Sequence, residues 1–139
     1  MIVDASVVID VVADEKDRGA TAREALSRIP GFEPLIAPAH FAIELMSGLR
    51  AFARRPGRRF SLDDVPRALL HAGSLGIDVE PTPWIDVSRA WELSGSLRFA
   101  DALYVAAAER HETTLLTCDG RIARSGAQFT CEVLTLQTR

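Results

Sequence analysis

Short apolar segments that alternate with helical ones constrain the fold of this 139-residue chain more than any other feature. We expect strands where aliphatic and β-branched residues gather in brief runs, at residues 1–3, 35–37, 77–79, 114–118 and 133–135. Strands separated by helices form parallel sheets with helices on both faces, because a parallel crossover needs a dozen or more residues. The sequence therefore predicts an α/β protein with three α/β/α layers around a mainly parallel sheet of four to five short strands.

The spacing of apolar residues also predicts the helices. They are expected over residues 5–12, 20–29, 38–54, 62–72, 84–93 and 101–111, with a short helix over 119–124. One apolar stripe of the third helix consists of Phe41, Leu45, Leu49 and Phe52. Pro38 suits the first turn of that helix, and Ser61 is a suitable N-cap for the next one. With no internal repeat, we expect residues 1–139 to form a single domain.

Composition excludes several classes of protein. A chain with 47% hydrophobic and 25% charged residues is typical of a folded, soluble domain. The net charge of -3 excludes a strongly basic nucleic-acid binder, so contact with nucleic acid would need a local basic patch or a bound metal. No apolar run spans a membrane and no signal peptide is evident, so we expect a cytoplasmic protein without membrane contact. Cys118 and Cys131 form neither a disulfide framework nor a zinc-spaced set.

Four acidic residues lie at positions where core packing gives no reason for a charged side chain: Asp4, Glu44, Asp101 and Asp119. Asp4 and Asp119 each follow a predicted strand, at the carboxyl end where parallel sheets form their sites. Glu44 and Asp101 lie in helical stretches that are otherwise rich in apolar residues. Carboxylates in such surroundings are unfavourable unless a nearby positive charge neutralises them.

Each acid also has an ordinary structural explanation. Most of the nineteen acidic residues must lie on solvated surfaces. Asp101 or Asp119 can cap a helix, which stabilises it by about 1 kcal/mol, and Glu44 can pair with Arg50. Considered together, however, carboxylates about 6 Å apart repel by roughly 3 kcal/mol per pair at an effective dielectric near 20. A hard cation such as Mg²⁺ or Mn²⁺ suits a site built from carboxylates alone.

These acids lie in segments that resemble the motifs of the PIN domain family. Asp4 opens the tripeptide Asp-Ala-Ser after the first strand, and Pro38 precedes a helix that carries Glu44. Residues 99–108 around Asp101 resemble the third motif, and residues 115–124 with their Thr-Cys-Asp resemble the fourth. The motifs occur in order over nearly the whole chain. In length and motif sequence, the chain is most similar to VapC-type toxins of bacterial toxin–antitoxin pairs.

The resemblance implies an Mg²⁺- or Mn²⁺-dependent endoribonuclease that hydrolyses RNA phosphodiester bonds by in-line attack of an activated water. Asp4 and Asp101 would be primary metal ligands, and Asp119 would complete or extend the metal site. Glu44 would act through a bound water or orient the nucleophile, while the hydroxyls of Ser6 and Thr117 would hold carboxylates and water in place. The implied partners are an RNA substrate, a cognate antitoxin and a second copy of the chain in a homodimer.

Three alternatives remain open from the sequence. A housekeeping RNA-processing nuclease of the PIN type would use the same chemistry. A non-catalytic PIN-like binding module would keep the fold without the activity, although the presence of all four acids argues against it. A phosphatase with an acidic cluster would need Asp-x-Asp where residues 4–6 of this chain read Asp-Ala-Ser.

A basic cluster follows the Glu44 helix and contains Arg54, Arg55, Arg58 and Arg59. One interpretation is a solvated surface with cations at a helix C-terminus. The others are a clamp for RNA phosphates or a docking surface for an acidic partner segment.

Aromatic, histidine and cysteine residues receive more ordinary predictions. Trp84 and Trp91 share one helix face and are expected to pack in the core, with a dimer or partner surface as the alternative. Phe99 and Tyr104 flank Asp101 and could stack a base, although core packing is expected for Tyr104. His40 is expected to be structural. Alternation along the fourth strand should turn Cys118 away from the acidic site.

Overall fold

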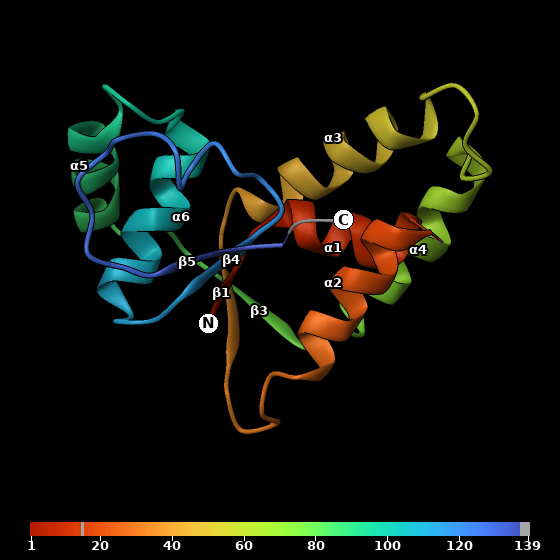
Figure 1. The fold of residues 1–139 in the computed structure, drawn as a ribbon, viewed down its shortest axis with the longest axis horizontal. Helices are drawn as coiled ribbons and strands as arrows, with labels where there is room; N and C mark the ends of the chain where they lie inside the picture. The colour runs from red at the N-terminus through yellow and green to blue at the C-terminus, as the bar shows by residue number, and fades with distance from the viewer. Residues whose placement is uncertain (15, 137–139) are drawn as a thin grey trace.

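A five-stranded parallel sheet forms the centre of the protein in the computed structural model, which describes residues 1–14 and 16–136 (Figure 1). Its spatial order is β3-β2-β1-β4-β5. The strands are β1 (Ile2–Val3), β2 (Leu35–Pro38), β3 (Ile77–Glu80), β4 (Leu115–Thr117) and β5 (Val133–Thr135). Every neighbouring pair is parallel, with Ile2 of β1 opposite Leu115 of β4 and in register with Ile36 of β2. The predicted sheet is confirmed.

Helices cover both faces of this sheet. The helical elements are α1 (Ala5–Ala13), α2 (Asp17–Ser27), α3 (Phe41–Ala53), the 3₁₀ turn η1 (Leu62–Asp64), α4 (Val65–Gly73), α5 (Trp84–Leu93) and α6 (Phe99–Arg110). In Figure 1, α1 to α4 lie on one side of the strands and the α5–α6 pair lies on the other. The three-layer α/β/α fold predicted from the sequence is therefore confirmed.

Side chains that alternate along the central strands divide the core into two clusters. Val3 of β1 and Leu116 of β4 pack with α1 and α3, whereas their neighbours Ile2 and Leu115 pack with α5 and α6. This alternation follows from the two-residue period of a strand, which turns successive side chains to opposite faces. The apolar stripe predicted for the third helix, Phe41, Leu45, Leu49 and Phe52, is buried in the first cluster as expected.

The strand order places a topological switch beside β1. The chain moves from β1 to β2 and β3 on one side, and then returns to add β4 and β5 on the other side. Such a switch leaves a crevice outside the carboxyl ends of the two central strands, where α/β proteins bind their ligands. Asp4 follows β1 directly, and Asp119 lies two residues beyond the end of β4. Both acids therefore reach the same edge of the sheet.

An ion pair joins the start of α5 to the end of α6. The Arg110 Nε donates to both carboxylate oxygens of the buried Asp86 at 2.9 and 3.1 Å, and the same guanidinium pairs with Glu80 at the end of β3. Ala90 and Leu93 of α5 are buried in the second core cluster. The position of α5 against α6 is therefore set by both charge and packing.

Three details of the predicted helices are wrong. Residues 120–124 form turns rather than a helix, because the Asp119 carboxylate accepts the Arg121 backbone N–H at 2.9 Å and offers the chain a local alternative to helical bonding. Pro38 ends β2, and α3 begins only at Phe41. Helix α6 begins at Phe99, so Asp101 lies in its first turn and not at its N-cap.

Ser61 caps the element it was predicted to cap, which is η1 leading into α4. Its backbone N–H donates to Asp64 at 2.7 Å, in a reciprocal capping box. Across residues 1–14 and 16–136, none of the helices has the length and hydropathy needed to cross a membrane.

Candidate functional site

Asp4 is a buried carboxylate held at the junction of β1 and α1. Its Oδ1 accepts the Ser6 backbone N–H at 3.2 Å and so caps α1, while its Oδ2 accepts the Thr117 hydroxyl at 2.5 Å. Burial raises the pKa of Asp4 to about 6, and the negative charge of Glu44 adds to this rise, whereas the hydrogen bonds from Thr117 and Ser6 oppose it. These hydrogen bonds therefore offset only part of the cost of burying the charged carboxylate.

The hydroxyls of Ser6 and Thr117 fasten the end of β1 to the segment after β4. Ser6 Oγ accepts the Cys118 backbone N–H at 3.0 Å, and Thr117 Oγ1 accepts the Asp119 backbone N–H at 3.0 Å. The two hydroxyl oxygens lie 3.5 Å apart. Thr117 therefore contacts the Asp4 side chain and the Asp119 backbone at once, which places these two acidic residues beside each other.

Glu44 approaches Asp4 through the buried Tyr104. The Tyr104 hydroxyl accepts the backbone N–H of Ala5 at 3.3 Å. Burial, together with the negative charges of Asp4 and Glu44, raises the pKa of Tyr104 above its usual range. Within the described residues, the buried Oε1 of Glu44 has no hydrogen-bond partner. This oxygen is buried beside Tyr104 and lies 3.6 Å from His40 Nε2.

His40 connects Glu44 to the segment that carries Asp101. Its Nε2 lies 3.0 Å from the carbonyl oxygen of Ala100, so this nitrogen is the N–H donor, and 3.6 Å from Glu44 Oε1. Burial lowers the pKa of His40, although the charge of Glu44 acts in the opposite direction. The His40 ring also packs against the Tyr104 ring, with centroids 4.5 Å apart and planes tilted by 56°.

Asp101 and Asp119 share the guanidinium of Arg98. Arg98 donates to Asp101 through Nε at 3.0 Å and through Nη2 at 3.3 Å, and its Nη2 lies 3.6 Å from Asp119 Oδ2. Arg121 also binds Asp119, through Nε at 2.9 Å and Nη2 at 2.6 Å. The hydrogen bonds from Arg121 lower the pKa of Asp119 despite its partial burial. This half of the site is neutralised by arginine.

The four predicted acids therefore lie around one edge of the sheet and are linked through shared neighbours. Thr117 links Asp4 to Asp119, Arg98 links Asp119 to Asp101, and Tyr104 lies between Asp4 and Glu44. Across residues 1–14 and 16–136, however, no three His, Cys, Asp or Glu side chains have the arrangement that would hold a metal ion. In this arrangement Arg98 pairs with both Asp101 and Asp119, and Arg121 pairs with Asp119.

The donor set nevertheless fits a divalent cation. It consists of carboxylate oxygens, which hard ions such as Mg²⁺ and Mn²⁺ prefer. The buried Asp4, and the Glu44 Oε1 that has no hydrogen-bond partner within residues 1–14 and 16–136, are the negative groups that would gain most from a positive charge. Asp4, Asp101 and Asp119 are the residues that could hold such an ion after Arg98 and Arg121, both largely exposed, turn outward.

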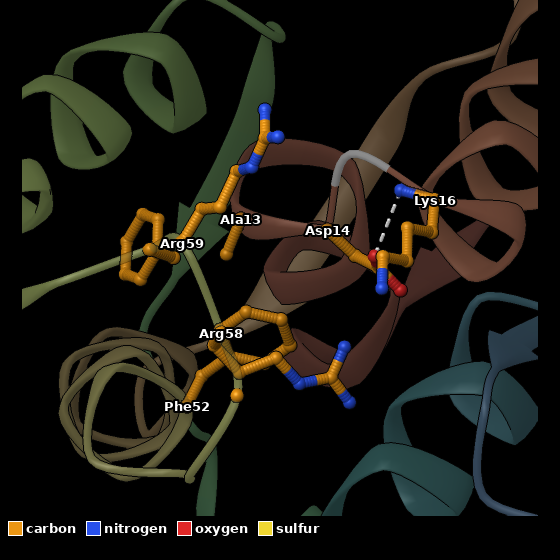
Figure 2. Close-up of a pocket in the computed structure, with 8 residues that line it drawn as sticks. Ala13, Asp14, Lys16, Phe52, Arg58 and Arg59 are labelled. Atoms are coloured by element: carbon orange, nitrogen blue, oxygen red, sulfur yellow. Dashed lines mark hydrogen bonds between the residues drawn. The ribbon is translucent and has the colours of Figure 1, made fainter.

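The arginine cluster lies well away from these acids. Arg58 and Arg59 line a cavity of about 320 Å³ whose other walls include Phe52, Asp14 and Lys16 (Figure 2). The Arg58 guanidinium lies over the Phe52 ring, 4.8 Å from its centroid. This cavity adjoins the C-terminal ends of α1 and α3, whereas the acids adjoin their N-terminal ends. At a rise of 1.5 Å per residue, the separation is about 15 Å.

The prediction of core packing for the tryptophans is wrong. Trp84 is 83% exposed and Trp91 is 71% exposed, because α5 turns Asp86, Ala90 and Leu93 toward α6 instead. Tyr104 is buried, as predicted.

Cys118 faces Asp10 on the side away from the acids, and burial raises the pKa of its thiol to about 12, so the prediction that it turns away is confirmed. Arg98 and Arg121 were not predicted as parts of the site. Arg98 lies three residues before Asp101, and Arg121 lies two residues after Asp119. These short spacings could have indicated that each arginine pairs with the nearby acid.

Comparison with known proteins decides the family. The sequence model of the PIN domain matches residues 1–127. The chain belongs to the PIN domain family. Ribonuclease VapC3 of Mycobacterium tuberculosis is 33% identical over 125 residues, which cover 90% of this chain and 86% of the relative. Ribonuclease VapC12 of the same organism is 31% identical over 126 residues, which cover 90% of this chain and 91% of the relative. These relatives support a nuclease.

Solved structures share the fold. A toxin–antitoxin complex from Klebsiella pneumoniae superposes with a TM-score of 0.70 and 17% identity, covering 99% of this chain and 98% of that one. VapC20 of Mycobacterium tuberculosis, a toxin that cleaves the sarcin–ricin loop, superposes with a TM-score of 0.67 and 20% identity, covering 94% and 98%. At these identities, the likeness shows that the PIN domain fold is common to all three proteins.

The hydrogen bond from Thr117 to Asp4 should contribute measurably to stability. Thr117→Val keeps the shape of the side chain but leaves a buried carboxylate oxygen without its donor, so we expect the free energy of unfolding to fall by about 1–3 kcal/mol. Urea denaturation followed by circular dichroism measures this change. Thr117→Ser retains the hydroxyl and should keep most of the stability, and equal losses in the two variants would contradict the role assigned to the hydroxyl.

Proposed function

We propose that this PIN domain protein is a metal-dependent endoribonuclease that hydrolyses RNA phosphodiester bonds as the toxin of a type II toxin–antitoxin pair. The observation that carries the proposal is the buried Asp4 at the β1–β4 switch point, with Glu44, Asp101 and Asp119 around it. Similarity to the VapC ribonucleases supports the nuclease chemistry. Residues 1–139 are proposed to form one nuclease domain.

Mg²⁺ or Mn²⁺ is the proposed cofactor, with Asp4, Asp101 and Asp119 as its ligands. Such an ion, when bound, activates a water molecule and stabilises negative charge on a phosphate. The hydroxyls of Ser6 and Thr117 keep Asp4 and the Asp119 backbone in position through the hydrogen bonds described above. The side chains of Arg98 and Arg121 can rotate into solvent, because they are 59% and 62% exposed.

Glu44 is proposed to orient the attacking water and accept its proton. Its Oε1 has no hydrogen-bond partner within the described residues, so it can accept a new bond without breaking an existing one. His40 remains neutral at this position and donates to the Ala100 carbonyl, which keeps it from competing for the carboxylate. A base within hydrogen-bond reach of the nucleophile contributes to such reactions by about 10²- to 10⁴-fold.

A cognate antitoxin and a second copy of the chain are the proposed protein partners. The antitoxin is supported by the structural likeness to chains from toxin–antitoxin complexes. Exposed apolar residues at the start of α5, Trp84 and Ile85, are consistent with a homodimer contact. A housekeeping RNA-processing nuclease would share the chemistry, and growth arrest on expression of the active protein separates the toxin from it.

The arginine cluster of Arg54, Arg55, Arg58 and Arg59 is proposed to bind RNA phosphates at a distance from the acids. These residues pair with no acidic side chain among the described residues, and Arg58 and Arg59 line the cavity at the ends of α1 and α3. Cations that neutralise phosphates give binding a dependence on salt concentration.

Replacing the proposed metal ligands should abolish cleavage. Asp4→Asn and Asp101→Asn each remove a carboxylate charge with little change of shape, so we expect the cleavage rate of RNA to fall about a hundredfold or more. Gel analysis of a labelled RNA measures the rate, and circular dichroism checks the fold. EDTA should stop the wild-type reaction, and Mg²⁺ or Mn²⁺ should restore it.

The matched control is Asp78→Asn, which removes an exposed carboxylate on β3 and should leave the rate unchanged. A folded Asp4→Asn, Asp101→Asn double variant that still cuts RNA with added Mg²⁺ would contradict the proposed site.

Removing the arginine cluster should make RNA binding less sensitive to salt. In the Arg54→Ala, Arg55→Ala, Arg58→Ala, Arg59→Ala variant, the slope of log K against log salt should become shallower by about 0.7 for each lost contact to single-stranded RNA. Fluorescence anisotropy at several salt concentrations measures the slope. Arg28→Ala, which removes an exposed arginine paired with Glu24 on α2, is the control and should keep the wild-type slope. An unchanged slope in the quadruple variant would remove the clamp.

A further inference from the structure

Two exposed aromatic rings form a stacked pair at the junction of α5 and α6. The ring centroids of Trp91 and Phe99 lie 6.0 Å apart with an interplanar angle of 13°. Trp91 is 71% exposed and Phe99 is 59% exposed. Large aromatic surface left in water is unfavourable, and clustered exposed rings commonly mark a surface that contacts a ligand or partner.

The helices that carry the pair are firmly packed. Trp91 lies on a helix that is fixed by the Asp86–Arg110 ion pair and by buried Ala90 and Leu93. Phe99 opens α6, most of whose following residues are buried. The backbone under both rings therefore needs little ordering when a ligand binds, which favours affinity.

The pair also lies next to the acidic residues at one edge of the sheet. Phe99 precedes Asp101 by two residues, and between them the chain has only Ala100, whose carbonyl binds His40. Arg98, on the other side of Phe99 in the sequence, reaches Asp101 and Asp119 with its guanidinium. The sugar separates a nucleobase from its phosphate. If the carboxylates act on the phosphate, the base would therefore lie on a surface beside them.

Charge distinguishes this surface from a purely apolar one. Arg98 directly precedes Phe99 and pairs with Asp101 and Asp119, and Arg121 pairs with Asp119, and both arginines are more than half exposed. Arginine beside aromatic rings is the combination with which proteins bind single-stranded nucleic acid, because the cation contacts phosphate while the ring stacks on a base.

We propose that Trp91 and Phe99 form a stacking platform for an unpaired nucleobase of the RNA substrate, with Arg98 contacting the adjacent phosphate. The inference rests on the proposed nuclease function and names its substrate class: RNA that is unpaired where it is cut. Bases in a duplex are stacked on one another and are not free to lie on a protein ring, so single strands and loops are the preferred substrates.

The test measures the binding of a short single-stranded RNA by fluorescence anisotropy, with Asp4→Asn in every protein so that the RNA is not cut. Trp91→Leu keeps an apolar side chain but loses the ring, and it should weaken binding about tenfold. Trp91→Phe keeps a ring and should stay within about threefold of the parent. Phe32→Ala removes an aromatic ring that is 87% exposed in the loop before β2, and as the control it should leave affinity unchanged.

A second arm removes the base instead of the ring. A series of RNAs with one abasic nucleotide at each position should contain one that binds the Asp4→Asn parent about tenfold more weakly. The same RNA should bind Asp4→Asn, Trp91→Leu with little further loss, because the ring and the base then contribute a single shared interaction. If the losses in affinity from Trp91→Leu and from the missing base were additive at every position of the RNA, the proposed stacking platform would be wrong.

Light scattering on the same variants addresses a second protein copy as the occupant. A Trp91→Leu protein that changes its molar mass and keeps its RNA affinity would overturn the inference, since the rings would then serve a protein contact. Cleavage by the protein with Asp4 intact is recorded separately. Persistent cleavage without base-dependent binding would remove the platform and keep the nuclease, whereas failure to cleave any RNA would remove the nuclease itself.

Discussion

The hydrogen bond from the Thr117 hydroxyl to Asp4 is the interaction on which the rest of the site depends. It joins the two central strands at the point where the strand order reverses, and it holds a carboxylate in a buried position. Thr117 also accepts the Asp119 backbone N–H, so one hydroxyl fixes two acidic residues relative to each other. A parallel sheet makes this possible, because neighbouring strands end at the same edge and bring distant residues together there.

The site is electrostatically divided into two halves. Asp101 and Asp119 are paired with Arg98 and Arg121, and arginine lowers the pKa of Asp119. In the described part of the chain no arginine pairs with Asp4 or Glu44, and burial raises the pKa of Asp4. An incoming cation would relieve the uncompensated half and release the arginines of the other half. Those arginines would then be free to contact a negatively charged ligand. In this way, binding of the proposed metal would favour binding of the proposed RNA.

Much of this arrangement could be predicted from the sequence, and the reasons are physical. The period of the strands and helices determined the layers, and the apolar stripe from Phe41 to Phe52 determined which face of α3 is buried. Asp4 and Asp119 were placed at one edge because parallel strands share their ends. The exposure of Trp84 and Trp91 could not be predicted, since helical spacing shows that residues share a face but not whether a neighbour covers that face. The pairing of Arg98 with two acids also depends on tertiary structure, because Asp119 is distant in sequence.

Diffraction from crystals grown with Mn²⁺, using its anomalous signal, tests the central claim most directly. The account predicts one strong peak at the β1–β4 edge, bounded by the carboxylates of Asp4, Asp101 and Asp119, with the Arg98 guanidinium displaced from between Asp101 and Asp119. A peak at another part of the surface, or an unchanged Arg98 bridge with no ion beside Asp4 at saturating Mn²⁺, would contradict it.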